Sequence, residues 1–462
     1  MHLLNKLPLS NTERKICIAS NPAACTTAES TQSDAGVFIA FKRAVGFLVK
    51  PTVRTGWASL VNQGVVSLNN FFTGVIIGRS CSKDEFGLYM LGFSVVLIAI
   101  DFQTSLVSTP YMVYSPHLKG RRHLSYAGSS LIHELLLSTL AVVALAVWGA
   151  GLSLGFGPPG LARVIWALAA TISFIMFREF VRRICFAELR MEVALLFDIC
   201  VGTVQIGGLL LLYHRGIISA GRAYWVIGAA CGIAGMGWLL LNRKTFAPGL
   251  SQAISDFQHN WKFGKWVFAS GVLWTVSMNL YPWFLNFFHG TASAGVWAAC
   301  IGVLALVNVP MVGIQNFLGP KIANVYAEGG GTALRRYVLK ASLFLLVVMS
   351  LLCAALFVVA DPLLTLFYGA RYSGNGLVVF ALALGLVAAS VAFSFSRALF
   401  AIERADTDFK VNFVSLFILF AFGIWLVRSF GPMGAALGLL LANVTSSGVR
   451  CASFAMLSRS AR

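Results

Sequence analysis

The chain has 462 residues, of which 58% are hydrophobic and only 11% are charged. A soluble globular domain is closer to half apolar and one quarter charged, so this composition excludes an ordinary soluble protein. The formal net charge of +18 is compatible with a nucleic acid or an anionic membrane surface as partner, and the distribution of charge along the chain must decide between them.

Residues 1–50 form an N-terminal segment that we expect to be a disordered cytoplasmic tail. Its first part is polar and rich in Ser, Thr, Ala and Asn, a composition that cannot bury enough apolar surface to fold. It lacks an apolar stretch of about 7–15 residues followed by a small-residue cleavage site, so we expect no cleaved signal peptide.

Twelve apolar stretches, each long enough to cross a bilayer of about 30 Å, follow from Trp57 onward. They predict an all-α polytopic membrane protein with twelve transmembrane helices. The expected spans are 57–77, 88–108, 130–152, 163–183, 194–213, 222–241, 265–288, 294–318, 338–359, 376–398, 409–428 and 433–455.

The basic residues are unevenly divided between the two sides that these spans define. Only seven of the 35 Lys and Arg residues fall in alternate loops assigned to the outside: Arg79, Lys83, Arg163, Arg215, Arg222, Arg371 and Arg428. This bias is the positive-inside pattern. It predicts that both termini are cytoplasmic and that membrane lipid, not nucleic acid, is the partner of the basic charge.

Polar side chains recur in the first, second, seventh and eighth spans, where hydrocarbon is expected. In the first span, positions 59, 62, 66, 70 and 73 follow helical spacing, so we expect most of its polar residues to share one face. The candidates for a hydrated substrate cavity are Asn62, Gln63, Asn70, Asp101, Gln103, Thr275, Asn279, Asn286, Asn308 and Gln315. The alternative is that these groups only form hydrogen bonds between packed helices.

Three carboxylates inside or near the spans are candidates for ion coupling: Asp101, Asp198 and Glu134. A carboxyl group in an apolar site can cycle between its protonated and ionised forms. Asp101 is the preferred candidate, although pairing with a neighbouring amide or basic group would explain it equally well. Glu134 could also be merely interfacial. Whether a proton or Na⁺ is coupled stays open, and no other cofactor is expected.

Residues 242–264 are expected to be an amphipathic interfacial linker between a six-helix lobe at 51–241 and another at 265–462. Leu250, Ile254, Phe257 and Trp261 recur on one helical face. In the span that follows, Pro282 removes a backbone donor and should bend the helix, with Asn279 or Asn286 available to the freed carbonyl. A gating role for this bend is one hypothesis, and an ordinary bend is the other.

An internal repeat relates the two halves of the chain. The sequence Arg183-Ile-Cys-Phe-Ala187 recurs as Arg397-Ala-Leu-Phe-Ala401, and the same offset pairs Asp198 with Asn412. Because an even number of spans separates equivalent positions, the two six-helix repeats should be parallel. The substrate path should then lie between them.

Basic residues near the inner boundary could attract a pyrophosphate group: Arg54, Arg183, Lys265 and Arg397. The alternative is simple positive-inside anchoring. Glu179 lies one helical turn before Arg183, and this opposite-charge pair could be purely structural. The nine cysteines contain no CxxC pair and no Cys/His cluster, so no metal site is expected.

Three patterns resemble the multidrug/oligosaccharidyl-lipid/polysaccharide flippase superfamily, and within it the Wzx-type exporters of O-antigen and exopolysaccharide units. They are Gly87-Leu-Tyr, the run from Ser108-Thr-Pro110 to Ser115-Pro116, and the Arg-x-x-Phe-Ala turn followed by Asp198. The resemblance implies a V-shaped, two-lobe transporter of the inner membrane. It would move an undecaprenyl-pyrophosphate-linked oligosaccharide to the outer leaflet by alternating access. Polysaccharide polymerase or export proteins would be its partners.

The chain departs from two branches of that superfamily. Lipid II flippases place Arg in the first, second and eighth spans, where this chain has Asn, Gln and Asp101. Multidrug extruders typically carry an acidic residue and a Pro in the first span, and this chain has neither there.

Other function classes remain as alternatives. A cation-coupled multidrug exporter of the same superfamily is the nearest one. A membrane glycosyltransferase or polymerase would need a large outer loop with catalytic side chains, which the short loops do not favour. The third alternative is a scaffold protein that does not transport. Separately, the absence of a GxxxxGK[ST] motif argues against direct use of ATP.

Overall fold

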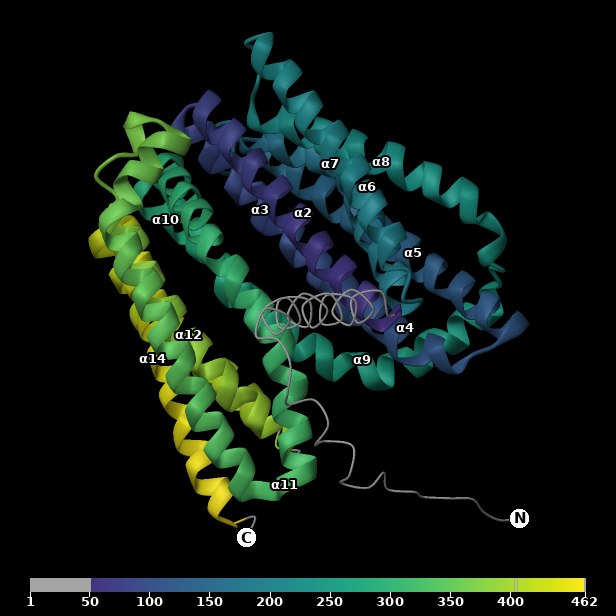
Figure 1. Ribbon diagram of the computed structural model, residues 1–462. Helices are drawn as coiled ribbons and strands as arrows, with labels where there is room; N and C mark the ends of the chain where they lie inside the picture. The colour runs from purple at the N-terminus through teal and green to yellow at the C-terminus, as the bar shows by residue number, and fades with distance from the viewer. Residues whose placement is uncertain (1–50, 403, 405, 461–462) are drawn as a thin grey trace, which may run out of the picture. The chain divides into compact units, whose positions relative to one another are not determined.

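The computed structural model describes residues 51–402, 404 and 406–460, so the predicted tail at 1–50 lies outside the described residues. By its internal contacts the chain divides into Met1–Trp57 and Ala58–Arg462, and every contact below lies within the second unit. Throughout the described part the regular structure is helical, which confirms the predicted all-α fold (Figure 1).

The described residues of the first half of the chain contain seven α-helices joined by short turns. They are α2 (Pro51–Ser80), α3 (Lys83–Gln103), α4 (Thr109–Tyr114), α5 (Gly120–Ser153), α6 (Leu161–Ala187), α7 (Met191–His214) and α8 (Ala220–Asn242). A π-helix, η1 (Thr104–Ser108), links α3 to α4. The 3₁₀ turns η2 (Ser115–His117) and η3 (Arg243–Thr245) follow α4 and α8.

The second half contains helices of very different lengths. They are α9 (Leu250–Asn279), α10 (Tyr281–His289), α11 (Thr291–Tyr368), η4 (Ala370–Tyr372), α12 (Gly376–Ala401), α13 (Asp406–Ile418), the π-helix η5 (Leu419–Gly423) and α14 (Ile424–Ser460). Both α11 and α14 are interrupted by a glycine outside helical geometry, Gly330 (φ 63°) and Gly431 (φ 54°). A positive φ is accessible to glycine at little cost, so each long helix can change direction there.

Helix covers all twelve predicted spans apart from Leu280 in the seventh, and the protein is a multi-pass membrane protein. Nine helices in the described part of the chain are both long and apolar enough to cross a membrane. The last of them, Lys410–Met456, contains two predicted spans separated by Gly431. The number twelve therefore stays a prediction.

Capping residues define where α3 and α8 begin. The Ser82 hydroxyl accepts a hydrogen bond from the Glu85 amide, and Asp84 and Glu85 lie in the first turn of α3, where carboxylates stabilise a helix N-terminus. The Glu85 carboxylate also accepts a hydrogen bond of 2.8 Å from the Ala220 amide at the start of α8. One acidic residue thus serves two helix N-termini.

The helices α6 and α12 are the buried centres of their halves. Leu168 and Ile172 of α6 and Val379 of α12 have no exposed surface. Both helices end at the repeat-equivalent alanines, α6 at Ala187 and α12 at Ala401. The peripheral helices instead expose large apolar side chains, such as Leu136 and Val147 of α5, as expected for surfaces that contact lipid.

The predicted interfacial linker is not a separate helix, because α9 continues from Leu250 through residues 264 and 265 to Asn279. The predicted apolar face is exposed: Leu250, Ile254, Phe257 and Trp261 are each more than 40% accessible. The opposite face is held on α5, where His133 Nε2 lies 2.8 Å from the Ala253 carbonyl and Tyr126 donates to Asn260 at 2.9 Å.

Candidate functional site

A cavity of about 460 Å³ lies between α2, α3 and α11. It contains three of the predicted cavity residues: Gln63 and Asn70 of α2 and Asn308 of α11. The structure therefore brings amide groups from the first and eighth spans together around one space. Ser67 adds a hydroxyl group, and the second span contributes Tyr89, Met90 and Phe93.

The polar residues of α2 divide between two faces, contrary to the single face expected from the sequence. Gln63, Ser67, Asn70 and Gly74 line the cavity at helical spacing. Asn62 is instead buried away from the cavity lining, and neither polar atom of its amide has a partner in the described residues. Farther along the same helix, Thr73 accepts a hydrogen bond of 2.7 Å from Gln205 of α7.

One end of the cavity is formed by aromatic rings. Phe86 of α3 stacks on Tyr368 at 5.8 Å and on Tyr89 at 6.2 Å between ring centroids. Tyr368 itself is only 1% exposed and fits against two glycines. A Cβ atom on Gly78 would lie 2.6 Å from its ring, and one on Gly302 would lie 1.9 Å from its hydroxyl group.

The helices are in close contact at the end where α2 passes into α3 and α10 passes into α11, which we call the turn end. A Cβ atom on Gly87 would lie 1.9 Å from the Thr291 carbonyl oxygen, and one on Gly295 would lie 2.2 Å from that of Lys83. Thr291 also donates a hydrogen bond to Asp84. Backbone contacts this close require glycine at positions 87 and 295.

Two arginines cross-link the same turn end. Arg79 at the end of α2 donates to the Leu366 carbonyl of α11 at 2.7 Å. Arg371, just after α11, donates to the carbonyls of Gly78 at 2.5 Å and Arg79 at 3.0 Å. Each guanidinium thus satisfies carbonyls that end the other helix. We call this pair the arginine clasp. Nothing in the sequence indicated it beyond two basic residues in loops assigned to the outside.

Asp101 lies at a second contact between the halves of the chain and does not line the cavity described above. Its carboxylate faces Gly271 and Thr275 of α9, and its Oδ2 has no hydrogen-bond partner among the described residues. A Cβ atom on Gly271 would lie 3.0 Å from Asp101 Oδ2, so the two helices approach closely there. Asn279 donates to the Thr275 carbonyl at 2.8 Å. Asp101 and Thr275 therefore face each other between α3 and α9, while the Asn279 bond lies within α9.

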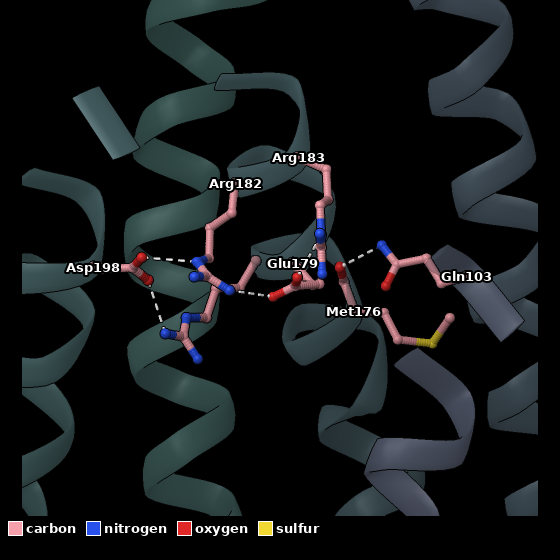
Figure 2. Close-up of polar contacts among 7 residues, drawn as sticks. Gln103, Met176, Glu179, Arg182, Arg183 and Asp198 are labelled. Carbon is pink, nitrogen blue, oxygen red and sulfur yellow. Dashed lines mark hydrogen bonds and ion pairs between the residues drawn. The ribbon is translucent and has the colours of Figure 1, made fainter. Parts of the chain in front are cut away.

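The remaining predicted cavity residues lie elsewhere. Gln103 is fully buried in the first half of the chain and donates to the Met176 carbonyl of α6 at 2.8 Å (Figure 2). Its position on the opposite side of α3 from Asp101 explains why sequence proximity was misleading. Asn286 of α10 and Gln315 of α11 are half-buried, and neither lines the described cavity.

Asp198 is held in a chain of ion pairs between α6 and α7. Its two oxygens accept hydrogen bonds from Arg178 at 2.8 Å and Arg182 at 2.7 Å. Figure 2 shows Arg182 between Asp198 and Glu179. The Arg182 guanidinium donates to the Glu179 carboxylate at 2.6 Å. This arrangement favours a structural role for Asp198 over the coupling role expected from the sequence.

Arg183 also belongs to this network, because it donates to Glu179 at 2.8 Å. At the repeat-equivalent position in the second half, Asn412 accepts a hydrogen bond of 3.3 Å from Arg450 of α14. Asn412 is the repeat equivalent of Asp198, so a residue at this position accepts a hydrogen bond from arginine in both halves. The acceptor is a carboxylate in α7 and an amide in α13.

Glu134 is fully buried in α5. Its Oε1 accepts a hydrogen bond from Ser138 at 3.2 Å, and its Oε2 has no partner in the described part of the chain. No basic side chain among the described residues forms a salt bridge with it.

The other basic candidates differ in their surroundings. Arg397 is exposed, with its guanidinium 4.9 Å from the Phe393 ring centroid and 5.8 Å from that of Phe400. Lys265 is exposed on α9. Arg54 lies within α2. Over the residues that the structure describes, no cluster of three His, Cys, Asp or Glu could hold a metal ion.

Pro282 lies where the seventh predicted span is interrupted. The helix α9 ends at Asn279 and α10 begins at Tyr281, with Pro282 buried in its first turn. Proline is well tolerated in a first turn because that position lacks a helical hydrogen bond anyway. Contrary to expectation, the Asn279 amide bonds Thr275 and not the carbonyl four residues before the proline.

The chain matches a known protein family and several solved structures. The family model described as "Polysaccharide biosynthesis protein" matches residues 52–322. No curated protein sequence matches the chain.

Solved structures share the fold at 15–17% sequence identity. An inward-facing multidrug resistance MATE family transporter of the MOP superfamily aligns with a TM-score of 0.71 and 16% identity, covering 85% of this chain and 94% of its own. Lipid II flippase MurJ, in an inward closed conformation, aligns with a TM-score of 0.70 and 17% sequence identity, and the alignment covers 87% of each chain. A MOP superfamily transporter from Pyrococcus furiosus aligns with a TM-score of 0.62 and 15% sequence identity. This alignment covers 88% of the present chain and 95% of the transporter. The chain therefore shares the fold of these transporters, as the sequence predicted.

Proposed function

We propose that the chain, which belongs to the polysaccharide biosynthesis protein family, moves an undecaprenyl-pyrophosphate-linked oligosaccharide from the inner to the outer leaflet of the cytoplasmic membrane. The observation that carries this proposal is the amide-rich cavity between α2, α3 and α11. Sugars present many hydroxyl groups, and Gln63, Asn70 and Asn308 offer both donors and acceptors to them.

The closed turn end supports alternating access as the mechanism. In the predicted topology this end faces the outside, so the arginine clasp and the Gly87–Thr291 contact would close the outer side of the path. Opening the outer side of the path would then require these contacts to separate while the helices close on the inner side. The Asp101–Thr275 contact between α3 and α9 is a candidate for the contact that changes on the inner side, with Pro282 and the α9–α10 break as a hinge.

Basic residues near the inner boundary would attract the pyrophosphate. Lys265 and Arg397 are exposed and suit this role, and Arg54 is a third candidate. Arg183 is the least suited, because Glu179 already neutralises it. Asp101 remains the preferred candidate for proton or Na⁺ coupling. Polymerase or export proteins would take over the glycan on the outer side.

Deletion of the gene tests this function. We expect polyprenyl-linked oligosaccharide to accumulate on the inner leaflet, and the full-length protein to restore its appearance on the outer leaflet. Unchanged surface polysaccharide and no accumulation in the deletion strain would contradict the proposal.

A multidrug exporter is the second candidate, favoured by the aromatic lining of the cavity, which also suits flat apolar cations. Proteoliposomes separate the two candidates. Translocation of a glycan lipid without efflux of cationic dyes supports the first, and the reverse result supports the second.

A further inference from the structure

Among the described residues, all the side chains that line the cavity are uncharged. Its polar groups are the amides and hydroxyls of Gln63, Ser67, Asn70, Asn308 and the tyrosines, and its remaining surface is apolar. A ligand group that enters this space must exchange water for neutral dipoles and aromatic rings. A charged group would lose its hydration without gaining an opposite charge.

The two guanidinium groups of the arginine clasp are already engaged. Arg79 and Arg371 lie beyond Tyr368 at the helix ends, and their guanidinium groups bond the backbone carbonyls of Leu366, Gly78 and Arg79. Tyr368, with 1% exposure, lies in the lining of the cavity. Neither arginine is among the lining residues.

The size of the cavity limits what it can hold. A volume of about 460 Å³ is within the range of about 300–1,000 Å³ that encloses a ligand of small-molecule size. A few sugar rings fit this space, but a complete polyprenyl-pyrophosphate oligosaccharide does not. Sugar rings have apolar C–H faces that pack on aromatic rings, and hydroxyl edges that bond amides.

We infer that this cavity selects neutral sugars: it receives the uncharged distal part of the glycan and discriminates against uronic acids and other acidic sugars. This inference rests on the proposed function and specifies the substrate class for the same site. The charged pyrophosphate would remain outside the cavity.

The test uses the full-length protein in proteoliposomes and two synthetic probes on the same polyprenyl pyrophosphate. One probe carries a neutral trisaccharide. In the other, the terminal hexose is replaced by the corresponding hexuronic acid. Translocation is followed by oxidation of the newly exposed glycan with an impermeant reagent. We expect the neutral probe to move at least about tenfold faster, which corresponds to about 1.4 kcal/mol.

Variants at Asn308 make the test specific to the cavity. Asn308→Lys should reduce the preference for the neutral probe by supplying a cation, and the nearly isosteric Asn308→Asp should slow the acidic probe further. Asn242→Lys is the matched control, because Asn242 lies at the end of α8 outside the cavity lining and should leave the preference unchanged.

The outcomes separate the inference from the proposed function. Equal rates for the two probes in the wild-type protein would overturn the inference and leave the proposed function standing. If neither probe moves, both are contradicted. A tenfold preference that changes in Asn308→Lys or Asn308→Asp, but not in Asn242→Lys, supports the inference.

Discussion

Arg371 donates a hydrogen bond to the carbonyl of Arg79 at 3.0 Å, although the two arginines lie on elements from opposite halves of the chain. Arg79 in turn bonds Leu366, only a few residues before Arg371. This reciprocal contact links the end of α2 to the end of α11. It joins two helix C-termini, where cations are stabilised by the exposed carbonyl groups.

Removing one half of the arginine clasp should open the turn end. In Arg371→Met, two hydrogen bonds from a charged donor are lost, each of which contributes about 1.5–3 kcal/mol in general and less where solvent screens it. We expect faster alkylation of Cys81, which lies buried in the turn between α2 and α3, in a variant that retains it as the sole cysteine. Arg215→Met, at the exposed end of α7, is the control and should leave the alkylation rate unchanged.

The pH dependence of Cys81 alkylation provides a second prediction. Burial, with a smaller contribution from Glu85, raises the pKa of the Cys81 thiol to about 11. Only the thiolate reacts, so below that pKa the rate should increase about tenfold per pH unit in the folded protein. The unfolded protein should instead level off near the ordinary thiol pKa of about 8.5. Because the folded state holds this proton more tightly, the contribution of Cys81 to stability should decline as pH rises above about 8.5. A folded-state plateau near 8.5 would contradict the burial of Cys81.

Gly302 should be sensitive to a single added methyl group. In Gly302→Ala the new Cβ would meet the Tyr368 hydroxyl at 1.9 Å, so the tyrosine must move or α11 must shift. Overpacking of this kind typically costs about 1–3 kcal/mol. We expect a lower unfolding temperature in detergent, partly restored in the double variant Gly302→Ala, Tyr368→Phe.

Gly64→Ala is the matched control for that experiment. Nothing lies within 4 Å of a Cβ atom at position 64, so alanine there should leave stability unchanged or raise it by roughly 0.5–1 kcal/mol through helix propensity. Equal losses at positions 64 and 302 would show that the Tyr368 contact is not the cause.

The ion-pair network of α6 and α7 should contribute to stability, not to transport. Asp198→Asn leaves two arginines facing a neutral amide, and breaking a buried pair costs about 3–5 kcal/mol. We expect a large fall in the unfolding temperature. Glu188→Gln removes an exposed pair with Arg190 at 3.3 Å and should cost at most about 0.5 kcal/mol. A stable Asp198→Asn protein with impaired transport would instead return Asp198 to the coupling candidates.

The contact between α3 and α9 should be required for transport. Asp101→Asn removes the carboxylate that meets Thr275, and Asn279→Leu removes the donor to the Thr275 carbonyl. Both variants should reach the membrane at normal levels and export little glycan. Normal surface polysaccharide in both would exclude these residues from the transport mechanism.

The sequence by itself determined that this is an all-helical membrane protein. The length and apolarity of a span are properties of a continuous segment, so they can be read without knowing its neighbours. The repeat could be detected from the sequence for the same reason, since Arg183–Ala187 and Arg397–Ala401 are local patterns. Both segments end a helix in the structure.

Only the tertiary structure decided which polar residues share the cavity. Helical spacing shows which residues lie on one face, but the rotation of that face toward a cavity or a neighbouring helix depends on packing. Gln63 and Asn70 therefore line the cavity, while Asn62 is buried away from it. The arginine clasp was equally inaccessible, because Arg79 and Leu366 are 287 residues apart and nothing local to either residue specifies the other.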